Sequence, residues 1–392
     1  MLDQTFSPQS LNKLVSGSDV AKYSLGVNGD SVLNTITSIS YEVSQESFKF
    51  ENVKVRKVKD KDVYYVDDRG EYFAVKKLNS IIKKLYTITH SNRNEILKQL
   101  IDIINDGTDY KLIRADIKDF FAQVPRKSLI NKIRKDSLLG SMMIHKLNQL
   151  NKFLIDNSCS GLPRGLSISS TLSELYLRDF DSYIKSNSNV YYYARYVDDI
   201  IIICLDNVEE VDLALNKGLE SLGLSVNEKY MVINDRGPES EFDYLGVKFR
   251  LSNKISKYSL STNKVKEIKT RVIKSIVDYR KNRDNELLIN RIIFLTSNYK
   301  IHTKTESNNL KAGIYYNNQY ITDYSQLAEL NEFLRKSLTA KRGSLAKLVR
   351  LIPSSVVSQC IRLSFFEGYI NKRIVCFSSK EISNIVRCWK HG

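Results

Sequence analysis

Apolar positions along the chain repeat with two different periods, so the sequence predicts a mixture of strands and helices. Short β-prone runs typical of strands occupy residues 51–66, 111–116 and 242–249. Residues 190–204 hold two strongly apolar runs that a pair of acids separates, which is the pattern of a hairpin. Helical spacing predicts helices over residues 74–106, 126–157, 169–184, 208–222 and 262–300. A hairpin turn is predicted at residues 67–70 and a loop at residues 161–165.

The composition of the chain, above all its positive net charge, indicates a polyanionic partner. The chain has 392 residues, of which 42% are hydrophobic and 27% charged, so it can fold into two or three domains or subdomains around a sizeable core. Its net charge of +16 favours nucleic acid, because each phosphate contact releases condensed counterions. A basic soluble protein without such a partner stays open on charge alone.

Several classes of protein are disfavoured by what the sequence does not contain. The five cysteines are scattered and never form a CxxC pair, which argues against a disulfide framework or a zinc cluster. There is no run of 18 apolar residues, and the first residues lack the basic and apolar regions of a secretory signal. We therefore expect a cytoplasmic protein that has no membrane partner.

The chemistry centres on two adjacent acids, Asp198 and Asp199, between the apolar runs of residues 190–204. Two neighbouring carboxylates raise each other's pKa unless a cation lies between them. Mg²⁺ suits such a site, because it binds one or two carboxylates together with phosphate oxygens and water. Taken alone, the four residues Tyr-Val-Asp-Asp are equally well explained as a surface turn.

A third acid, Asp116, ends the predicted strand 111–116. If this strand lies beside the predicted hairpin, the three carboxylates meet, and such a cluster can hold two Mg²⁺ ions about 4 Å apart. Taken alone, Asp116 is better explained as a strand-end acid that caps a turn. Between the acids, the glycines of residues 161–165 let the backbone approach a nucleotide closely.

Five segments in order resemble the palm motifs A to E of reverse transcriptases. They are ADIKDFF (115–121), GLPRGLSISS (161–170), YVDD (196–199), LGLSVNEK (222–229) and FDYLGVKF (242–249). The resemblance implies an α+β fold of the right-hand polymerase type, with fingers, a palm built on an antiparallel sheet and a helical thumb. It places an N-terminal extension and fingers at residues 1–110, the palm at 111–255 with a fingers insertion at about 126–160, and the basic thumb or C-terminal region at 256–392.

The resemblance also implies roles for single residues. Two Mg²⁺ ions would be held by Asp116 and Asp198 with the backbone of Ile117, and Asp199 would support them as a third catalytic acid. The residues expected around the incoming nucleotide are Arg93, Asp119, Phe120, Phe121, Arg164, Gly165 and Lys229, and those of the primer grip are Tyr244, Leu245 and Gly246.

Three of these nucleotide-site residues carry a specific expectation. Phe121 would exclude a ribose 2′-OH, which makes deoxynucleotides the expected substrate. Arg164 stands where most of the class has Gln, so its charge and planar fork change the contact with the nucleotide. Lys229 would donate a proton to the leaving pyrophosphate. Without the motifs, Phe121 would be read as a core residue and Lys229 as a solvated one.

Within the class, the intact Pro-Arg-Gly, the phrase YARYVDD and the C-terminal segments resemble bacterial retron-like, abortive-infection and defence-associated enzymes, including the smaller enzyme of two-polymerase systems. This implies an RNA-directed DNA polymerase that copies a dedicated noncoding RNA into DNA in antiviral defence. A second reverse transcriptase or another copy of the chain would be the protein partner. The alternatives are an RNA-dependent RNA polymerase, a non-catalytic RNA-binding protein on a polymerase fold, and a basic structural module.

Overall fold

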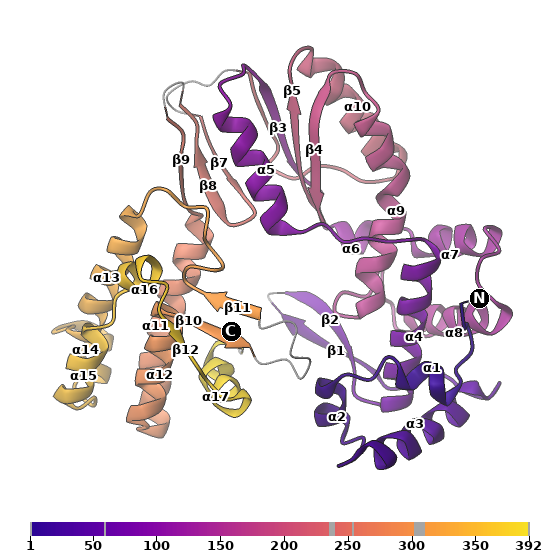
Figure 1. The fold of residues 1–392 in the computed structure, drawn as a ribbon, viewed down its shortest axis with the longest axis horizontal. Helices are drawn as coiled ribbons and strands as arrows, with labels where there is room; N and C mark the ends of the chain where they lie inside the picture. Colours follow the sequence, from indigo (N-terminus) through magenta and orange to yellow (C-terminus); the bar gives the residue numbers. More distant parts are fainter. Residues whose placement is uncertain (1, 59, 235–239, 253–254, 302–309, 391–392) are drawn as a thin grey trace. The chain divides into compact units, whose positions relative to one another are not determined.

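The chain folds into two compact units. The computed structural model describes residues 2–58, 60–234, 240–252, 255–301 and 310–390 (Figure 1). The first unit comprises residues 1–96 and 109–234, and the second comprises residues 97–108 and 235–392. The second unit is therefore assembled from two stretches that lie far apart in the sequence.

The first unit combines a four-stranded sheet and a two-stranded hairpin with helices. Its strands are β1 (Val53–Val58), β2 (Lys61–Val66), β3 (Lys111–Asp116), β4 (Val190–Tyr196), β5 (Asp199–Cys204) and β6 (Met231–Ile233). Its helices are α1 (Pro8–Asn12), α2 (Gly17–Tyr23), α3 (Gly29–Ser44), α4 (Arg69–Leu85), α6 (Phe120–Gln123), α7 (Arg126–Lys135), α8 (Ser141–Asp156), α9 (Ser167–Lys185) and α10 (Val208–Ser221). Helix α5 (Arg93–Asn105) begins in this unit and continues into the second.

The four-stranded sheet is antiparallel, in the order β4-β5-β3-β6. Successive side chains of a strand point to opposite faces of the sheet, and both faces of β3 and β5 are largely buried. On one face, Ile113 and Ile202 belong to a core shared with Leu175 of α9 and Leu215 of α10. The opposite face carries the acids at the ends of β3 and β5.

The second unit is a helical bundle with two small sheets. Its helices are α11 (Thr262–Asn282), α12 (Asn285–Thr296), α13 (Ser325–Leu338), α14 (Gly343–Val349), α15 (Ser354–Ile361), α16 (Phe365–Ile370) and α17 (Ser379–Lys390). Its strands are β7 (Glu241–Tyr244), β8 (Val247–Arg250), β9 (Lys257–Leu260), β10 (Asn298–Ile301), β11 (Leu310–Gly313) and β12 (Ile374–Val375). Helix α11 packs against α12, α13 and α17, and this packing buries residues such as Val272 and Ile292.

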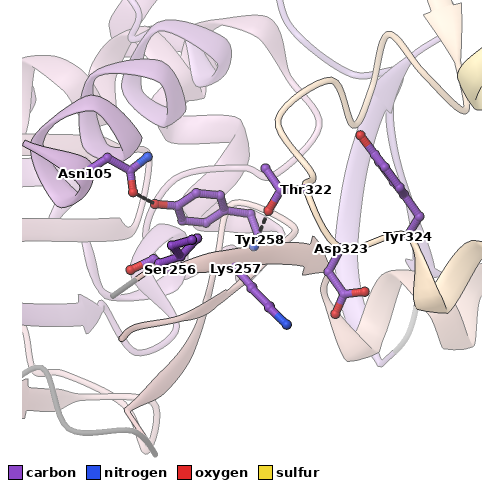
Figure 2. A pocket seen from close by; sticks show the side chains of 8 residues that line it. Asn105, Ser256, Lys257, Tyr258, Thr322, Asp323 and Tyr324 are labelled. Carbon is purple, nitrogen blue, oxygen red and sulfur yellow. Dashed lines mark hydrogen bonds between the residues drawn. The ribbon is translucent and has the colours of Figure 1, made fainter. Parts of the chain in front are cut away.

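A hydrogen bond links the two stretches of the second unit. Figure 2 shows the Tyr258 ring of β9 pointing at Asn105, the last residue of α5, and the hydroxyl donates to Asn105 Oδ1 at 2.7 Å. The Tyr258 amide also donates to Thr322 Oγ1 at 3.1 Å. These groups line a cavity of about 550 Å³. Since they are bonded to one another, we interpret the cavity as structural.

Two predictions for the N-terminal half were wrong. The residues predicted as a hairpin turn at 67–70 instead begin α4, because the Asp68 side chain caps the helix by accepting from the Glu71 amide at 2.8 Å. The β1–β2 hairpin turns earlier, since Val58 pairs with Lys61. The helix predicted over 74–106 is two helices, and Thr87, with a φ of 48°, lies in the break.

Three more predicted elements are divided. The strand predicted at 242–249 is the β7–β8 hairpin, whose turn residues Leu245 and Gly246 both have positive φ, 47° and 78°. The helix predicted over 262–300 ends at Asn282, because Arg283 has a φ of 53° and Asp284 caps the next helix. The helix predicted over 126–157 is α7 followed by α8. None of the described helices has the length and apolarity to cross a membrane.

Candidate active site

The sheet brings the three predicted acids to one edge. Asp116, the last residue of β3, lies opposite Asp199, the first residue of β5. Asp198 lies in the turn between β4 and β5, directly after Val197, whose φ is 61°. The Ile117 amide donates to the Asp198 carbonyl at 3.0 Å, so the turn is tied to the end of β3. The predicted hairpin with acids at its turn is present.

Cationic and amide side chains surround these acids. Lys229 Nζ lies 2.8 Å from Asp116 Oδ2, and the Asn227 amide donates to the other oxygen of the same carboxylate. Arg114, two residues before Asp116 on the same face of β3, lies 3.1 Å from Asp199 Oδ1 and 3.8 Å from Asp116 Oδ2. Arg114 is only 5% exposed, so its charge acts on the acids with little screening by water.

The electrostatics of this cluster suit a divalent cation. Burial and then the charge of Asp116 raise the pKa of Asp199 to about 6, and the same two causes raise the pKa of Asp198. All three donors are carboxylates, the ligands that hard cations prefer. In the part of the chain that the structure describes, no group of three or more His, Cys, Asp or Glu stands in a metal-ligating arrangement.

The loop after α8 lies directly against the segment that follows β3. Gly161, with a φ of 58°, passes so close that an added Cβ would lie 2.2 Å from the Phe121 carbonyl oxygen. The Leu162 amide donates to that same carbonyl at 2.6 Å. Buried Arg126 holds the loop from behind by donating to the carbonyls of Cys159, at 3.0 Å, and Gly161. The position of Phe121 is thus fixed by backbone contacts.

The β1–β2 hairpin contacts the loop of residues 161–165. Gly165, with a φ of 101°, lies under the hairpin, and the Tyr64 amide donates to the Arg164 carbonyl at 2.7 Å. The Arg164 guanidinium lies over the half-buried Phe121 ring, 5.7 Å from its centroid. Lys61 Nζ lies 3.4 Å from Asp119 Oδ1. Phe121, Arg164 and Gly165, which were predicted to lie together, are neighbours.

The remaining predicted residues have other surroundings. Phe120 is 1% exposed and belongs to the core of the first unit. Arg93 begins α5 and donates to Asn94 at 3.3 Å. The predicted primer-grip residues Tyr244, Leu245 and Gly246 form the end of β7 and the β7–β8 turn in the second unit. Their functional roles stay predictions.

Sequence reasoning missed three residues of the site: Arg114, Asn227 and Lys61. A signal for Arg114 was available, because it precedes Asp116 by two residues and therefore shares its face of the strand. Asn227 lies two residues before Lys229 in the fourth motif and could have been singled out with it. Nothing local distinguishes Lys61 from the other lysines of its hairpin, because its contact with Asp119 spans 58 residues.

Residues 69–249 match the family described as "Reverse transcriptase (RNA-dependent DNA polymerase)". The chain contains a reverse-transcriptase domain. This domain confirms the predicted enzyme class, RNA-directed DNA polymerase, and the predicted α+β fold of the right-hand polymerase type. No protein of curated function matches the chain.

Among solved structures, the chain is similar to telomerases from two Candida species. Apo telomerase from Candida tropicalis is 14% identical, with 96% of this chain and 66% of that chain covered and a TM-score of 0.42. Telomerase from Candida albicans, in complex with a fragment of telomeric RNA, is 14% identical, with coverages of 97% and 66% and a TM-score of 0.40. Candida tropicalis telomerase truncated from its C-terminal domain is 15% identical, with coverages of 53% and 54% and a TM-score of 0.36. The chain spans about two thirds of the telomerases at most, and likenesses of this size say nothing about its activity.

Proposed function

We propose that this protein extends a primer with deoxynucleotides on an RNA template by two-metal-ion phosphoryl transfer. The observation that carries the proposal is the direct pairing of Asp116 with Asp199 across β3 and β5, with Asp198 in the adjoining turn. Acids from two strands meet there at one end of the sheet, which is the kind of cluster that can hold two metal ions. The reverse-transcriptase domain match over residues 69–249 supports the same chemistry.

In this proposal Asp116 and Asp198, with the Ile117 backbone, hold two Mg²⁺ ions, and Asp199 supports them. When bound, the ions would favour deprotonation of the primer hydroxyl and neutralise charge on the triphosphate. Lys229, now bonded to Asp116, would turn to the leaving pyrophosphate and donate a proton. Arg114 would keep Asp199 ionised and oriented, because their side chains lie 3.1 Å apart.

The incoming nucleotide would lie between residues 115–121, the first of the five motifs, and the β1–β2 hairpin. We assign its sugar to Phe121 and Arg164, and its triphosphate to the backbone of residues 117–119. Lys61 is our candidate for a cation that binds the triphosphate, because it already contacts Asp119. Arg93 stays a second candidate for that role. Tyr244, Leu245 and Gly246 would grip the primer.

A single assay tests the proposed activity. The purified protein is given an RNA template with a DNA primer, labelled deoxynucleotides and Mg²⁺, next to Asp198→Asn. We expect labelled DNA from the intact protein alone, and its synthesis should be abolished when RNase treatment precedes the reaction. Incorporation that survives in Asp198→Asn would show that the acids are not the catalytic centre.

Phe121→Ala is expected to increase ribonucleotide use relative to deoxynucleotide use on the order of 10- to 100-fold, since it removes the ring that would meet a 2′-OH. The measurement is the ratio of kcat/KM for a nucleoside triphosphate and its deoxy counterpart. Phe120→Leu is the control, because Phe120 is buried in the core and should change stability more than selectivity. An unchanged ratio in Phe121→Ala would remove the gate assignment.

One observation favours a second candidate function, a non-catalytic RNA-binding protein on the polymerase fold. Lys229 and Arg114 already neutralise Asp116 and Asp199 in the structure. If those ion pairs are permanent, no divalent cation binds. Isothermal titration with Mn²⁺ separates the two functions: the catalytic proposal predicts binding that Asp198→Asn weakens, whereas the alternative predicts none.

The finer assignments rest on the motif resemblance. We propose fingers at residues 1–110 and about 126–160, a palm at 111–255 and a thumb at 256–392. We also propose a dedicated noncoding RNA as template, a role in bacterial antiviral defence in the cytoplasm, and a second reverse transcriptase or another copy of the chain as partner. Sequencing the RNA that copurifies with the protein tests the template: a single enriched species supports it, and a mixture of cellular RNAs contradicts it.

A further inference from the structure

A buried arginine lies directly behind the turn that carries Asp198. Arg195 is the last but one residue of β4 and is 5% exposed. It shares the helix-facing side of the strand with Tyr193, two residues earlier, and this side packs against α9. A charged side chain is rarely buried to this degree unless partners compensate it.

Every N–H group of the Arg195 guanidinium has an acceptor. Asp181 accepts from Nε at 2.9 Å and from Nη2 at 2.7 Å, and Glu174 accepts from Nη1 at 3.2 Å and from Nη2 at 2.7 Å. Both acids belong to α9, and Asp181 is held in turn by the Tyr193 hydroxyl at 2.6 Å. The guanidinium is therefore clamped in one orientation by the helix.

The fifth N–H of Arg195 donates to the turn that carries Asp198. Arg195 Nη1 lies 2.8 Å from the carbonyl oxygen of Val197, the residue before Asp198. Val197 has a φ of 61°, a conformation that a β-branched residue adopts only when its surroundings hold it. On the other side, the Ile117 amide holds the Asp198 carbonyl at 3.0 Å. The peptide groups before and after Asp198 are thus both fixed by hydrogen bonds.

We propose that Arg195 is a positioning residue: clamped by Glu174 and Asp181, it sets the Val197–Asp198 peptide so that Asp198 is presented to the divalent cations. The inference rests on the proposed function, since it concerns the same site. Arg195 touches neither substrate nor metal and acts through the turn. The chemistry it supplies is orientation, which a lysine cannot reproduce because it has three donors and no planar fork.

A cavity makes this network accessible to a small cation. About 240 Å³ of polar space is lined by Glu174, Asp181 and Arg195 together with hydroxyl side chains, among them Thr87 and Ser182, and with two other cations, Arg178 and Lys185. If Arg195 is truncated, a guanidinium ion from solution has both a path and two carboxylates to bind. A residue that only fills space in the core would not be replaced in this way.

The test compares Arg195→Lys and Arg195→Ala with a matched control in the second unit. Arg291 is also buried, at 2% exposed, and pairs with Asp278 at 2.8 Å, so Arg291→Lys removes a comparable ion pair away from the turn. We expect Arg195→Lys to lower kcat about 10- to 100-fold with little change in the KM for deoxynucleotide, in keeping with lost orientation. Methylguanidinium should restore part of the activity of Arg195→Ala and none to Arg291→Ala.

Mn²⁺ binding, followed by electron paramagnetic resonance, gives a readout that does not depend on turnover. We expect Arg195→Lys to weaken it about tenfold and Arg291→Lys to leave it unchanged. If kcat and Mn²⁺ affinity fall no further in Arg195→Lys than in Arg291→Lys at equal loss of thermal stability, the positioning role is overturned. If the unmodified protein incorporates no nucleotide but its Mn²⁺ binding still depends on Arg195, the proposed function fails while this inference stands.

Discussion

Asp116→Asn is expected to lower deoxynucleotide incorporation by at least about a thousandfold, which corresponds to roughly 4 kcal/mol of transition-state stabilisation. Asp116 is 7% exposed and lies opposite Asp199, so it is the acid at which charge matters most in a poorly solvated site. Asparagine keeps the shape of the side chain but has a single acceptor oxygen, so it can accept from Asn227 or from Lys229 and not from both. The measurement is single-turnover primer extension at saturating Mg²⁺, together with thermal denaturation to show that the variant is folded.

Asp179→Asn is the matched control for this prediction. Its side chain on α9 is 78% exposed and pairs with Lys132 at 2.7 Å, so it carries the same charge change without a place in the site. We expect its activity to stay within about twofold, as for most surface changes. Equal losses in the two variants would mean that overall charge, and not the acid cluster, sets the rate.

Gly161→Ala is the second change for which we expect a large effect, on the order of a 100-fold loss of activity. The added Cβ would lie 2.2 Å from the Phe121 carbonyl oxygen and 2.5 Å from that of Ala122. Because both atoms are backbone, the segment that carries Phe121 must shift to relieve the clash. Steady-state kinetics should show a raised KM for deoxynucleotide as well as a lower kcat.

Gly223→Ala separates the clash from the cost of the backbone conformation. Gly223 has a φ of 68°, close to the 58° of Gly161, but an added Cβ there has nothing within 4 Å. Both variants should lose on the order of 1 kcal/mol of stability from the left-handed conformation, whereas only Gly161→Ala should lose nucleotide binding. Similar kinetics in the two variants would show that the close approach does not position Phe121.

The sequence contained enough to place the acids but not their partners. The apolar runs of residues 190–204 predicted a hairpin with Asp198 and Asp199 at its turn. That the strand ending in Asp116 lies beside this hairpin was only a condition, and the register meets it. The contacts of Lys61 and Asn227 bridge stretches far apart in the chain, about which local periodicity says nothing. Arg195 lies in the segment YARYVDD, yet its burial depends on two acids of α9 that only the packed structure brings near.

Errors in the predicted elements arose where a turn interrupts a continuous apolar pattern. Residues 242–249 alternate as one strand would, and only the positive φ of Leu245 and Gly246 reveals two strands. The identity of Leu245 does not indicate a turn, because leucine seldom adopts a positive φ. At residues 67–70 a turn was predicted where a helix begins. Asp68 suits a turn and a helix cap equally well, and in the structure it caps α4.

The bond between Tyr258 and Asn105 has a practical meaning for protein engineering. Because residues 97–108 fold with the C-terminal unit, an exchange of everything after residue 234 between two such polymerases would transplant only part of a folding unit. The recipient would keep its own end of α5, including Asn105, against a foreign β9. A graft should therefore transfer residues 97–108 and 235–392 together, because they form one compact unit.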